Sequence, residues 1–467
     1  MSSRACIMVL WTIAVSVSAS RPAAAGFDLA AAIEATDAGG VIEVPVGIYR
    51  GQFVINKPLT LIGPERPILD GGGDGDVIKV TAPDVTIRGF LIRNTGISLD
   101  RENAGITVLA PRVVIEDNVL RDVLFGIYLK GAESSVIRGN DIGGKNLPVQ
   151  RRGDGIRIWQ SHETVIEDNV VTDSRDAVIW FSDGVELRRN RITNGRYGLH
   201  FMYSDGNVLE ENHLEGNSVG AFLMYSKNLT LRRNVCIGNR GPSGYGVGLK
   251  DMDNTVAEDN LFVGNRIGLQ FDNSPSSMRV HDVYRRNVFA YNDIGVAFLP
   301  SVKRNSLTDN TFLENIEQVA ILGRGDFRGN HFAVDDRGNF WSDYRGYDLD
   351  GDGIGDIPHK AWSLFENLID REPKLRLFLY SPSQQAIEMA SRAFPIVRPE
   401  AKFTDTAPLM QPVLGAVELR RGGAPWPIAA TAAVMLGASA VVLLIGARPF
   451  QITERAASPD AAIGGVE

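Results

Sequence analysis

The sequence predicts an all-β protein built as a single-stranded parallel β-helix, and an internal repeat is the main observation behind this prediction. A phrase of a charged residue, any residue and an asparagine recurs with a period of about 22 residues. Each period also holds two or three short runs rich in Val, Ile and Leu, separated by Gly, Asn and Asp. A period of this length is too short for a pair of helices and suits one coil of a solenoid. The asparagines are Asn118, Asn140, Asn169, Asn190, Asn212, Asn234, Asn260, Asn287, Asn310 and Asn330.

These asparagines are expected at tight corners between strands. Asparagine tolerates a left-handed backbone, and its side chain bonds neighbouring backbone groups. Because the corners of successive coils stack, the side chains should form a ladder along the solenoid. Every strand then pairs with its equivalent in the next coil, and only the end coils expose unpaired edges.

The β-helix is expected to occupy residues 26–340, since weaker copies of the pattern begin near residue 40 and the last copy lies near residue 330. The segment from Asp28 to Thr36 has helical apolar periodicity, which predicts a short N-terminal cap helix over the first coil. Residues 341–400 mix aromatic, proline and acidic residues and are predicted to form a C-terminal cap or extension. Residues 401–426 are predicted to be a linker.

Both ends of the chain resemble targeting segments. Residues 1–25 have the charged, apolar and small-residue order of a secretory signal peptide, which predicts export. Residues 427–447 carry no charge, are flanked by arginines and are long enough to cross a bilayer. We therefore predict a C-terminal transmembrane helix that tethers an exported body, with residues 448–467 left in the cytoplasm.

Charge and cysteine content narrow the functional classes. The net charge of -8 argues against nucleic acid as a partner, because nucleic acids attract clustered Lys and Arg. Removal of the signal peptide leaves Cys236 as the single cysteine, so no internal disulfide can form. Its slot in the repeat is filled by Leu120, Leu214 and Phe262 in other coils, which favours a buried core thiol over a metal-binding or redox role.

Three methionines share one slot when consecutive coils are aligned on Gly198, Gly220 and Gly248. In neighbouring coils the first and third residues after the glycine are apolar, and alternate strand residues face opposite sides, so these two must face the core. The second and fourth residues are then expected to point outward. The outward residues of successive coils are Ile179 and Phe181, His200 and Met202, Phe222 and Met224, and Lys250 and Met252.

The outward methionines allow two compatible interpretations, a copper site and a hydrophobic docking patch. Adjacent coils lie about 4.8 Å apart, close to twice a metal–sulfur bond of about 2.3 Å. A soft ion can therefore lie between methionine sulfurs on neighbouring coils. Thioether and imidazole ligands select Cu(I) over Zn²⁺ or Mg²⁺. The candidate copper ligands are His200, Met202, Met224 and Met252, and an exposed methionine patch is also a typical docking surface.

An acidic loop near the C-terminal end predicts a structural calcium site. Asp348, Asp350, Asp352 and Asp356 stand at alternate or nearby positions around a glycine at the sixth place, the pattern of loops whose oxygen ligands converge on Ca²⁺. The twelfth position, which holds a glutamate in helical calcium loops, is His359. The loop is therefore expected to be of a non-helical kind, with an acidic turn that holds no ion as the alternative.

A carbohydrate-active enzyme is the alternative function. Asp154 and Asp176 occupy consecutive coils near Arg157, and stacked carboxylates about 5 Å apart would match a retaining glycosidase. Any two acids one period apart satisfy this spacing in a solenoid. The Gly-His-Gly and Arg-Ile-Lys signatures expected of pectin-degrading enzymes are absent from the sequence. Solvated turn acids are therefore the favoured interpretation over a lyase, epimerase or glycosidase site.

Three features together resemble the NosD family of periplasmic maturation proteins of nitrous oxide reductase. They are the signal peptide, the asparagine repeat, and the run Gly338-Asn-Phe-Trp-Ser-Asp-Tyr344 joined to the acidic loop. The resemblance covers roughly residues 26–400. It implies a right-handed, pectin-lyase-like β-helix of the carbohydrate-binding and sugar-hydrolase type without catalysis of its own. It also implies a periplasmic body that works with an ABC-type ATPase, a membrane permease and a copper chaperone to deliver copper or sulfur to the copper centre of nitrous oxide reductase.

Overall fold

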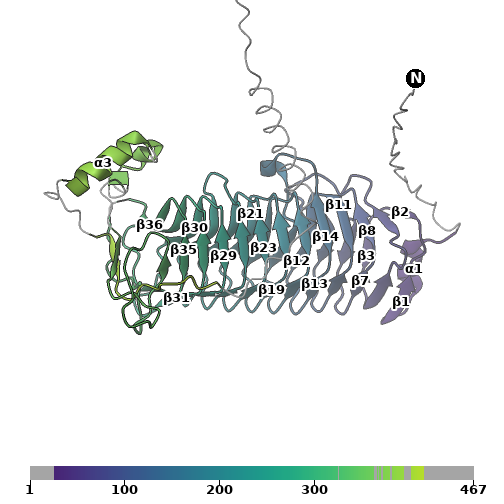
Figure 1. Cartoon of the computed structure of the whole chain (residues 1–467). Coiled ribbons are helices and arrows are strands. Elements are labelled where there is room, and N and C mark those ends of the chain that lie inside the picture. Colours follow the sequence, from purple (N-terminus) through teal and green to yellow (C-terminus); the bar gives the residue numbers. More distant parts are fainter. Residues whose placement is uncertain are drawn as a thin grey trace, which may run out of the picture. The chain divides into compact units, whose positions relative to one another are not determined.

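Three parallel sheets, here called sheets A, B and C, form the body of the protein in the computed structural model (Figure 1). The structure describes residues 26–323, 325–361, 365, 368–369, 372–378, 381–393 and 401–414. The predicted signal peptide, transmembrane helix and cytoplasmic tail lie outside these residues. Among the helices within the described ranges, none combines the length and the apolar character that a bilayer crossing requires.

Each coil gives one strand to each sheet, and every strand pairs in parallel with its equivalent in the next coil. Sheet A contains β1 (Gly40–Glu43), β4 (Leu59–Ile62), β7 (Thr86–Arg88), β10 (Val114–Glu116), β13 (Val136–Arg138), β16 (Val165–Glu167), β19 (Glu186–Arg188), β22 (Val208–Glu210), β25 (Thr230–Arg232), β28 (Val256–Glu258), β31 (Asp282–Arg285) and β34 (Asn305–Thr308). Sheet B contains β2 (Ile48–Arg50), β5 (Ile68–Asp70), β8 (Leu91–Arg93), β11 (Val119–Val123), β14 (Asp141–Gly144), β17 (Val170–Thr172), β20 (Arg191–Thr193), β23 (His213–Glu215), β26 (Val235–Ile237), β29 (Leu261–Val263), β32 (Val288–Ala290), β35 (Thr311–Leu313) and β37 (Phe340–Trp341). Sheet C contains β3 (Phe53–Ile55), β6 (Ile78–Val80), β9 (Ala104–Val108), β12 (Phe125–Lys130), β15 (Ile156–Trp159), β18 (Asp176–Trp180), β21 (Tyr197–Met202), β24 (Val219–Met224), β27 (Tyr245–Lys250), β30 (Ile267–Asp272), β33 (Ile294–Phe298) and β36 (Glu317–Ile321). The period of the repeat is thus one coil of three short strands.

The asparagines form the predicted ladder, at the corner between sheets A and B. The backbone N and the Nδ2 of Asn190 donate to Oδ1 of Asn212 at 3.1 and 3.0 Å, and the same Nδ2 donates to the carbonyl of Ile166 at 2.8 Å. All of these groups are buried, so the ladder satisfies polar atoms that water does not reach. Its members are Asn118, Asn140, Asn169, Asn190, Asn212, Asn234, Asn260, Asn287, Asn310 and Asn339.

Two details of the asparagine prediction are wrong. The left-handed backbone falls on the residue before the asparagine, as in Arg189 with φ 54°, and not on the asparagine itself. Asn330 belongs to another corner, where it accepts from the backbone N of Asn305, and Asn339 takes its place in the ladder. The last coil carries asparagines at two corners, and spacing alone does not distinguish them.

A second asparagine ladder, which the repeat phrase did not reveal, lies at the corner between sheets B and C. The backbone N and the Nδ2 of Asn239 both donate to Oδ1 of Asn265 at 2.9 Å. The members of this ladder are Asn217, Asn239, Asn265, Asn292 and Asn315.

The charged residue of the repeat phrase alternates in sign from coil to coil. Glu116, Arg138, Glu167, Arg188, Glu210, Arg232, Glu258 and Arg285 are aligned in register along sheet A. Glu210, for example, lies 3.1 Å from Arg232 and 3.7 Å from Arg188. If a strand of sheet A paired with the strand two coils away instead of its neighbour, two residues of the same charge would lie side by side. The alternation of charge therefore favours the observed pairing.

The first coil is preceded by α1 (Leu29–Ala35), a helix whose N-cap residue Asp28 accepts from the backbone N of Ala31 at 3.1 Å. Its apolar residues Leu29 and Ile33 are buried in the same hydrophobic cluster as the strands. The sequence pattern from Asp28 to Thr36 therefore forms a helix that contributes to the core of the solenoid.

The C-terminal end of the solenoid is closed by a segment that the sequence analysis assigned to the linker. Strand β39 (Phe403–Asp405) pairs antiparallel with β38 (His359–Ala361). The buried carboxylate of Asp405 accepts from the backbone N of Asn339 at 2.7 Å and from Nε1 of Trp341 at 2.9 Å, so it ends the asparagine ladder. The linker prediction is thus wrong for residues 401–414, because the unpaired end of the core requires a cover. The described residues between β38 and β39 include η2 (Pro373–Phe378) and α3 (Pro382–Ala393).

Cys236 is a core residue, as its place in the repeat predicts. It pairs with Leu214 and Phe262 in the adjacent coils and is fully buried. Burial raises the pKa of its thiol to about 12, which leaves it protonated and unreactive at neutral pH.

Candidate functional site

Met202 and Met224 are direct partners in adjacent strands of sheet C. Strand β21 pairs with β24 so that His200 meets Phe222 and Met202 meets Met224. Leu199 and Phe201, which alternate with His200 and Met202 along β21, are fully buried in the core. Alternation therefore places His200, Met202 and Met224 on the outer face of sheet C, as predicted, and both methionines are half-buried there.

The prediction that Met252 continues this row is wrong. Met224 pairs with Lys250, and Met252 is fully buried in the hydrophobic core. The glycine that aligns with Gly220 is Gly246, whose carbonyl oxygen would lie 2.4 Å from a Cβ on Gly220. Gly248, on which the prediction rests, lies two residues after this position, because the loop before β27 hides which of the two glycines keeps the register.

Met252 instead takes the place of a serine in a ladder of buried serines at the corner between sheets C and A. Ser204 donates its backbone N to Oγ of Ser226 at 3.0 Å, and Met252 donates its own backbone N to Oγ of Ser274 at 3.0 Å. The neighbouring bridge between Lys227 and Asp253 places Met252 in the same slot as these serines. Met252 is therefore a core residue with no access to the outer face.

On the other side of Met202, the outward partners are also shifted by one residue. Val178 pairs with His200 and Trp180 with Met202, where the sequence analysis expected Ile179 and Phe181. The register changes between Asp176 and Val178, since β21 has one additional residue at that point. The outer row that contains the methionines thus reads Lys130, Trp159, Trp180, Met202, Met224, Lys250 and Asp272 in successive coils.

His200 lies in a covered, aromatic environment and is only 7 % exposed. Its ring is perpendicular to those of Trp180 and Tyr197, with centroids 5.3 and 5.0 Å away. Its Nδ1 lies 3.4 Å from Oδ2 of Asp176 without hydrogen-bond geometry. A carboxylate beside one ring nitrogen is a common arrangement for a histidine that binds a metal through the other nitrogen.

Asp176 remains ionised in this environment. Burial raises the pKa of its carboxyl group, but His200 and Arg196 outweigh burial and leave the pKa below its ordinary value. Arg196 is a bidentate partner, with Nε 3.0 Å from Oδ1 and Nη2 on Oδ2. The pair fixes the carboxylate beside His200.

Asp154, the other acid of the predicted catalytic pair, is also buried and bound to arginines. Its Oδ1 lies 3.0 Å from Arg175, and its Oδ2 lies 3.8 Å from Arg157, which in turn contacts Glu102 at 3.0 Å. Burial raises the pKa of Asp154 to about 6 against the influence of these arginines. Asp154 and Asp176 are each only 1 % exposed, so the prediction that they are solvated turn acids is wrong.

A column of stacked aromatic rings borders the methionine pair and was missed by the sequence analysis. Phe181, Tyr203 and Tyr225 follow the outer residue of three successive coils, with centroids 5.3 and 5.1 Å apart and planes 14° apart. All three have φ between 51° and 53°, a left-handed conformation that bulky residues rarely adopt. Phe181 is 37 % and Tyr203 49 % exposed. In the sequence, an aromatic residue directly follows each of Trp180, Met202 and Met224, and this pattern indicates the column.

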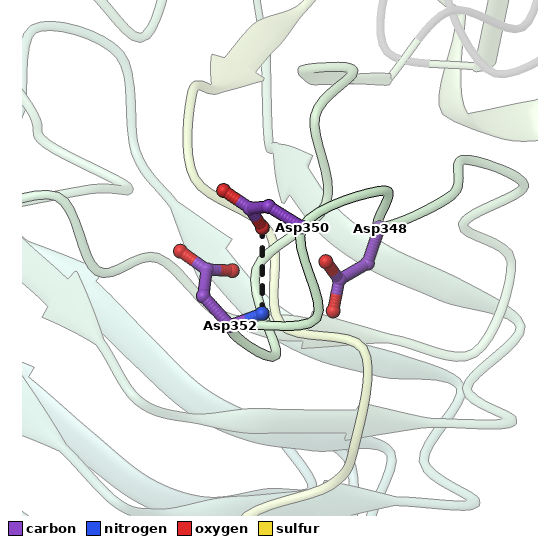
Figure 2. A group of neighbouring side chains, drawn as sticks. All are labelled: Asp348, Asp350 and Asp352. Atoms are coloured by element: carbon purple, nitrogen blue, oxygen red, sulfur yellow. Dashed lines mark hydrogen bonds between the residues drawn. The ribbon is translucent and has the colours of Figure 1, made fainter.

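The acidic loop brings together three of its four predicted calcium ligands (Figure 2). Carboxylate oxygens of Asp348, Asp350 and Asp352 lie within 4.8 Å of one another, whereas Asp356 is outside this group and accepts from the backbone N of Leu349 at 2.8 Å. Asp348 accepts from the backbone N of Gly353 at 2.9 Å and from that of Gly351 at 2.7 Å, and these hydrogen bonds hold its pKa below the ordinary value.

The loop is joined to the segment that closes the solenoid. Gly355 donates to the carbonyl of Pro408 at 2.8 Å, and Met410 donates to the carbonyl of Gly353 at 3.0 Å. The predicted twelfth-position residue, His359, is buried against Trp341, with nearly parallel rings 5.0 Å apart. Burial lowers the pKa of His359. It is part of the aromatic end of the core.

Comparisons with known proteins agree on the fold and on the family. Residues 139–346 match the family model described as periplasmic copper-binding protein (NosD), and residues 71–184 match the model of a right-handed β-helix region. Among solved structures, the A-modules of the Azotobacter vinelandii mannuronan C-5 epimerases AlgE4 and AlgE6 share the fold, with TM-scores of 0.52 and 0.51 and identities of 13 and 14 %. Each likeness covers 65 % of this chain and 93 % of the other.

Two curated relatives match most of the chain. A probable ABC transporter binding protein NosD of Pseudomonas aeruginosa is 33 % identical over 389 residues, which cover 80 % of this chain and 89 % of the relative. Its counterpart in Stutzerimonas stutzeri is 29 % identical over 386 residues, which cover 79 % and 86 %. With this degree of identity over nearly the whole relative, and with a right-handed parallel β-helix as its body, the chain belongs to the NosD family.

Proposed function

We propose that this protein is a periplasmic accessory protein in the maturation of nitrous oxide reductase, and that it holds copper in transit at Met202, Met224 and His200. In this proposal it acts with an ABC-type ATPase and a membrane permease, receives Cu(I) from a copper chaperone and passes it toward the copper centre of the reductase. A C-terminal helix at residues 427–447 would tether the body to the inner membrane. Sulfur as the delivered species is the alternative cargo.

The observation that carries the proposal is the in-register pair of half-buried methionines beside a histidine on one outer face. Met202 and Met224 are partners across adjacent strands, and His200 lies two residues before Met202 on the same face. Thioether sulfur and imidazole nitrogen suit Cu(I) better than they suit Zn²⁺ or Mg²⁺. The description of the matching family model as a periplasmic copper-binding protein supports the same ion.

The test is a titration of the full-length protein with Cu(I) under anaerobic, reducing conditions against a coloured Cu(I) chelator. The wild type should bind Cu(I) near stoichiometrically and prefer it to Zn²⁺. The double variant Met202→Leu, Met224→Leu keeps size and apolarity but lacks both sulfur ligands, so its binding should fall while folding is unchanged. If this variant keeps both Cu(I) binding and reductase maturation, the proposed metal site is wrong, and the methionines are then explained as a hydrophobic docking surface.

Two other methionines provide matched controls for the same substitution. Met252 is fully buried in the core, and Met278 is 88 % exposed in the loop between β30 and β31. Neither lies on the outer row of sheet C. Met252→Leu and Met278→Leu should therefore bind Cu(I) like the wild type, which separates loss of the site from loss of any methionine.

The carbohydrate-enzyme alternative finds less support in the geometry. Asp154 and Asp176 have pKa values displaced in opposite directions, as acid and base pairs do. Both carboxylates are nevertheless 1 % exposed and paired with arginines, so neither is presented to a substrate. Turnover of a uronan or glycan by the wild type that is lost in Asp154→Asn would establish the enzyme instead.

We further propose that the acidic loop binds a structural Ca²⁺ through Asp348, Asp350 and Asp352, with Asp356 as a supporting acid. Carboxylate oxygens are the ligands Ca²⁺ prefers. Because the loop is bonded to Pro408 and Met410, the ion would stabilise the segment that closes the C-terminal end.

A further inference from the structure

Trp180 lies directly beside the proposed copper ligands. It is the partner of Met202 in the adjacent strand, and its ring is 5.3 Å from the ring of His200. On the outer face of sheet C, an indole therefore precedes the two methionines by one coil. Adjacent strands are about 4.8 Å apart, so an ion held at Met202 would be within reach of the indole ring.

A cation from the preceding coil lies over the Trp180 ring. The guanidinium carbon of Arg157 lies 5.6 Å from the Trp180 centroid. Arg157 is in β15, the strand before β18, whereas Met202 is in β21, the strand after it. The Trp180 ring thus contacts an arginine of the preceding coil and His200 of the following coil, in which Met202 is its strand partner.

Packing stability alone does not explain a tryptophan here. Its indole Nε1 is buried and has no hydrogen-bond partner. A buried unpaired donor is unfavourable. The row does not require a tryptophan at every coil, since besides Trp159 it holds lysine, methionine and aspartate. The property that only the indole supplies is a large electron-rich face, which attracts cations more strongly than phenylalanine or tyrosine does.

We propose that Trp180 is a specificity-determining residue of the copper site, where its indole contacts the ion by a cation–π interaction and excludes water. This inference rests on the proposed function. A monovalent soft ion with few ligands tolerates an apolar wall, whereas Zn²⁺ and Cu²⁺ prefer nitrogen, oxygen and water ligands that the wall excludes. Transfer of a divalent ion from water to such a site also costs more free energy than transfer of a monovalent ion. Trp180 therefore favours Cu(I) over both divalent ions.

The test compares the wild type with Trp180→Leu and Trp180→Phe as full-length proteins. Cu(I) affinity is measured by competition with a coloured chelator, and Ag(I), a redox-inert substitute for Cu(I), is titrated while tryptophan fluorescence is recorded. Trp180→Leu should bind Cu(I) about tenfold more weakly, which corresponds to about 1.4 kcal/mol, and should lose part of its preference over Zn²⁺. Ag(I) should quench the wild type but leave both variants nearly unquenched.

Trp159 supplies the matched control, because it is in the same row one coil further from Met202. Trp159→Leu should keep both the affinity and the quenching. If Trp180→Leu binds Cu(I) as tightly as the wild type, or is still quenched by Ag(I), the role of Trp180 is wrong. If Trp180→Leu does not fold, the Cu(I) affinity and the Ag(I) quenching of Trp180→Phe decide instead. Trp180→Phe should bind Cu(I) about threefold more weakly than the wild type.

The result for the methionines separates this inference from the proposed function. If the double leucine variant of Met202 and Met224 keeps wild-type binding, the copper site itself is wrong, and so is the role of Trp180. If the double variant loses binding while Trp180→Leu does not, the copper site holds and only the role of Trp180 is overturned.

Discussion

Asp282→Asn should make the protein less sensitive to rising pH. Asp282 is the first residue of β31 and is fully buried. Its Oδ1 accepts from the backbone N of Thr255 at 2.9 Å, and its Oδ2 accepts from the hydroxyl of Tyr284 at 3.4 Å. Burial raises the pKa of this carboxyl group from 3.8 to about 7. In the next coil the equivalent residue is Asn305, so an amide fits this corner of the solenoid.

The sign and the size of the effect follow from the pKa. A folded-state pKa above the unfolded one means that the folded protein holds the proton more tightly, so this stability is fully present below about pH 3.8 and is lost as pH rises through about 7. At about 1.4 kcal/mol for each pH unit between the two pKa values, the loss in the wild type is at most about 4 kcal/mol. The asparagine variant has no such proton and should not show this loss.

The assay is urea unfolding followed by circular dichroism at pH 5 and pH 8 for the wild type and the variant. The stability of Asp282→Asn relative to the wild type should increase by at least about 1 kcal/mol between the two pH values. Asp100→Asn, which changes an exposed carboxylate, should show no such pH-dependent difference. A constant difference between Asp282→Asn and the wild type at both pH values would refute the reasoning that burial keeps this carboxyl group protonated.

Three further predictions concern the ladders and the acidic loop. Asn212→Ala leaves donors and acceptors of the buried ladder without partners, so urea unfolding should show a loss of about 3 kcal/mol, against less than about 0.5 kcal/mol for the exposed Asn146→Ala. Glu210→Lys places a third cation between Arg188 and Arg232 and should lower the unfolding midpoint, with part of the loss recovered in high salt. Chelation of Ca²⁺ should lower the thermal midpoint of the wild type but not that of the double variant Asp350→Asn, Asp352→Asn; equal effects on both would exclude the loop as the site.

The repeat determined the architecture from sequence because it is enforced by local chemistry in every coil. The asparagine of the charged-x-Asn phrase has a side chain that bonds the next coil, and the alternating Glu and Arg residues align those coils. The same periodicity placed Met202 and Met224 on one outer face and Cys236 in the core. These residues occupy regular coils of nearly constant length, so a fixed number of residues along the sequence corresponds to one coil of the solenoid.

The repeat period does not predict the position of a residue where a coil changes length or where a segment distant in sequence packs against the solenoid. The loop before β27 hid that Gly246, and not Gly248, keeps the register, so only strand pairing showed that Met252 is buried.

The additional residue in β21 decided that Trp180, and not Phe181, is beside Met202. The return of Asp405 to the end of the ladder involves residues 66 positions apart, which no local pattern encodes. The coil and its inward and outward faces follow from the sequence pattern, because the hydrogen bonds and the burial that define them repeat at short range. The tertiary structure alone decided the register at irregular coils and the closure of the end, because both depend on which distant groups satisfy unpaired polar atoms and cover the core.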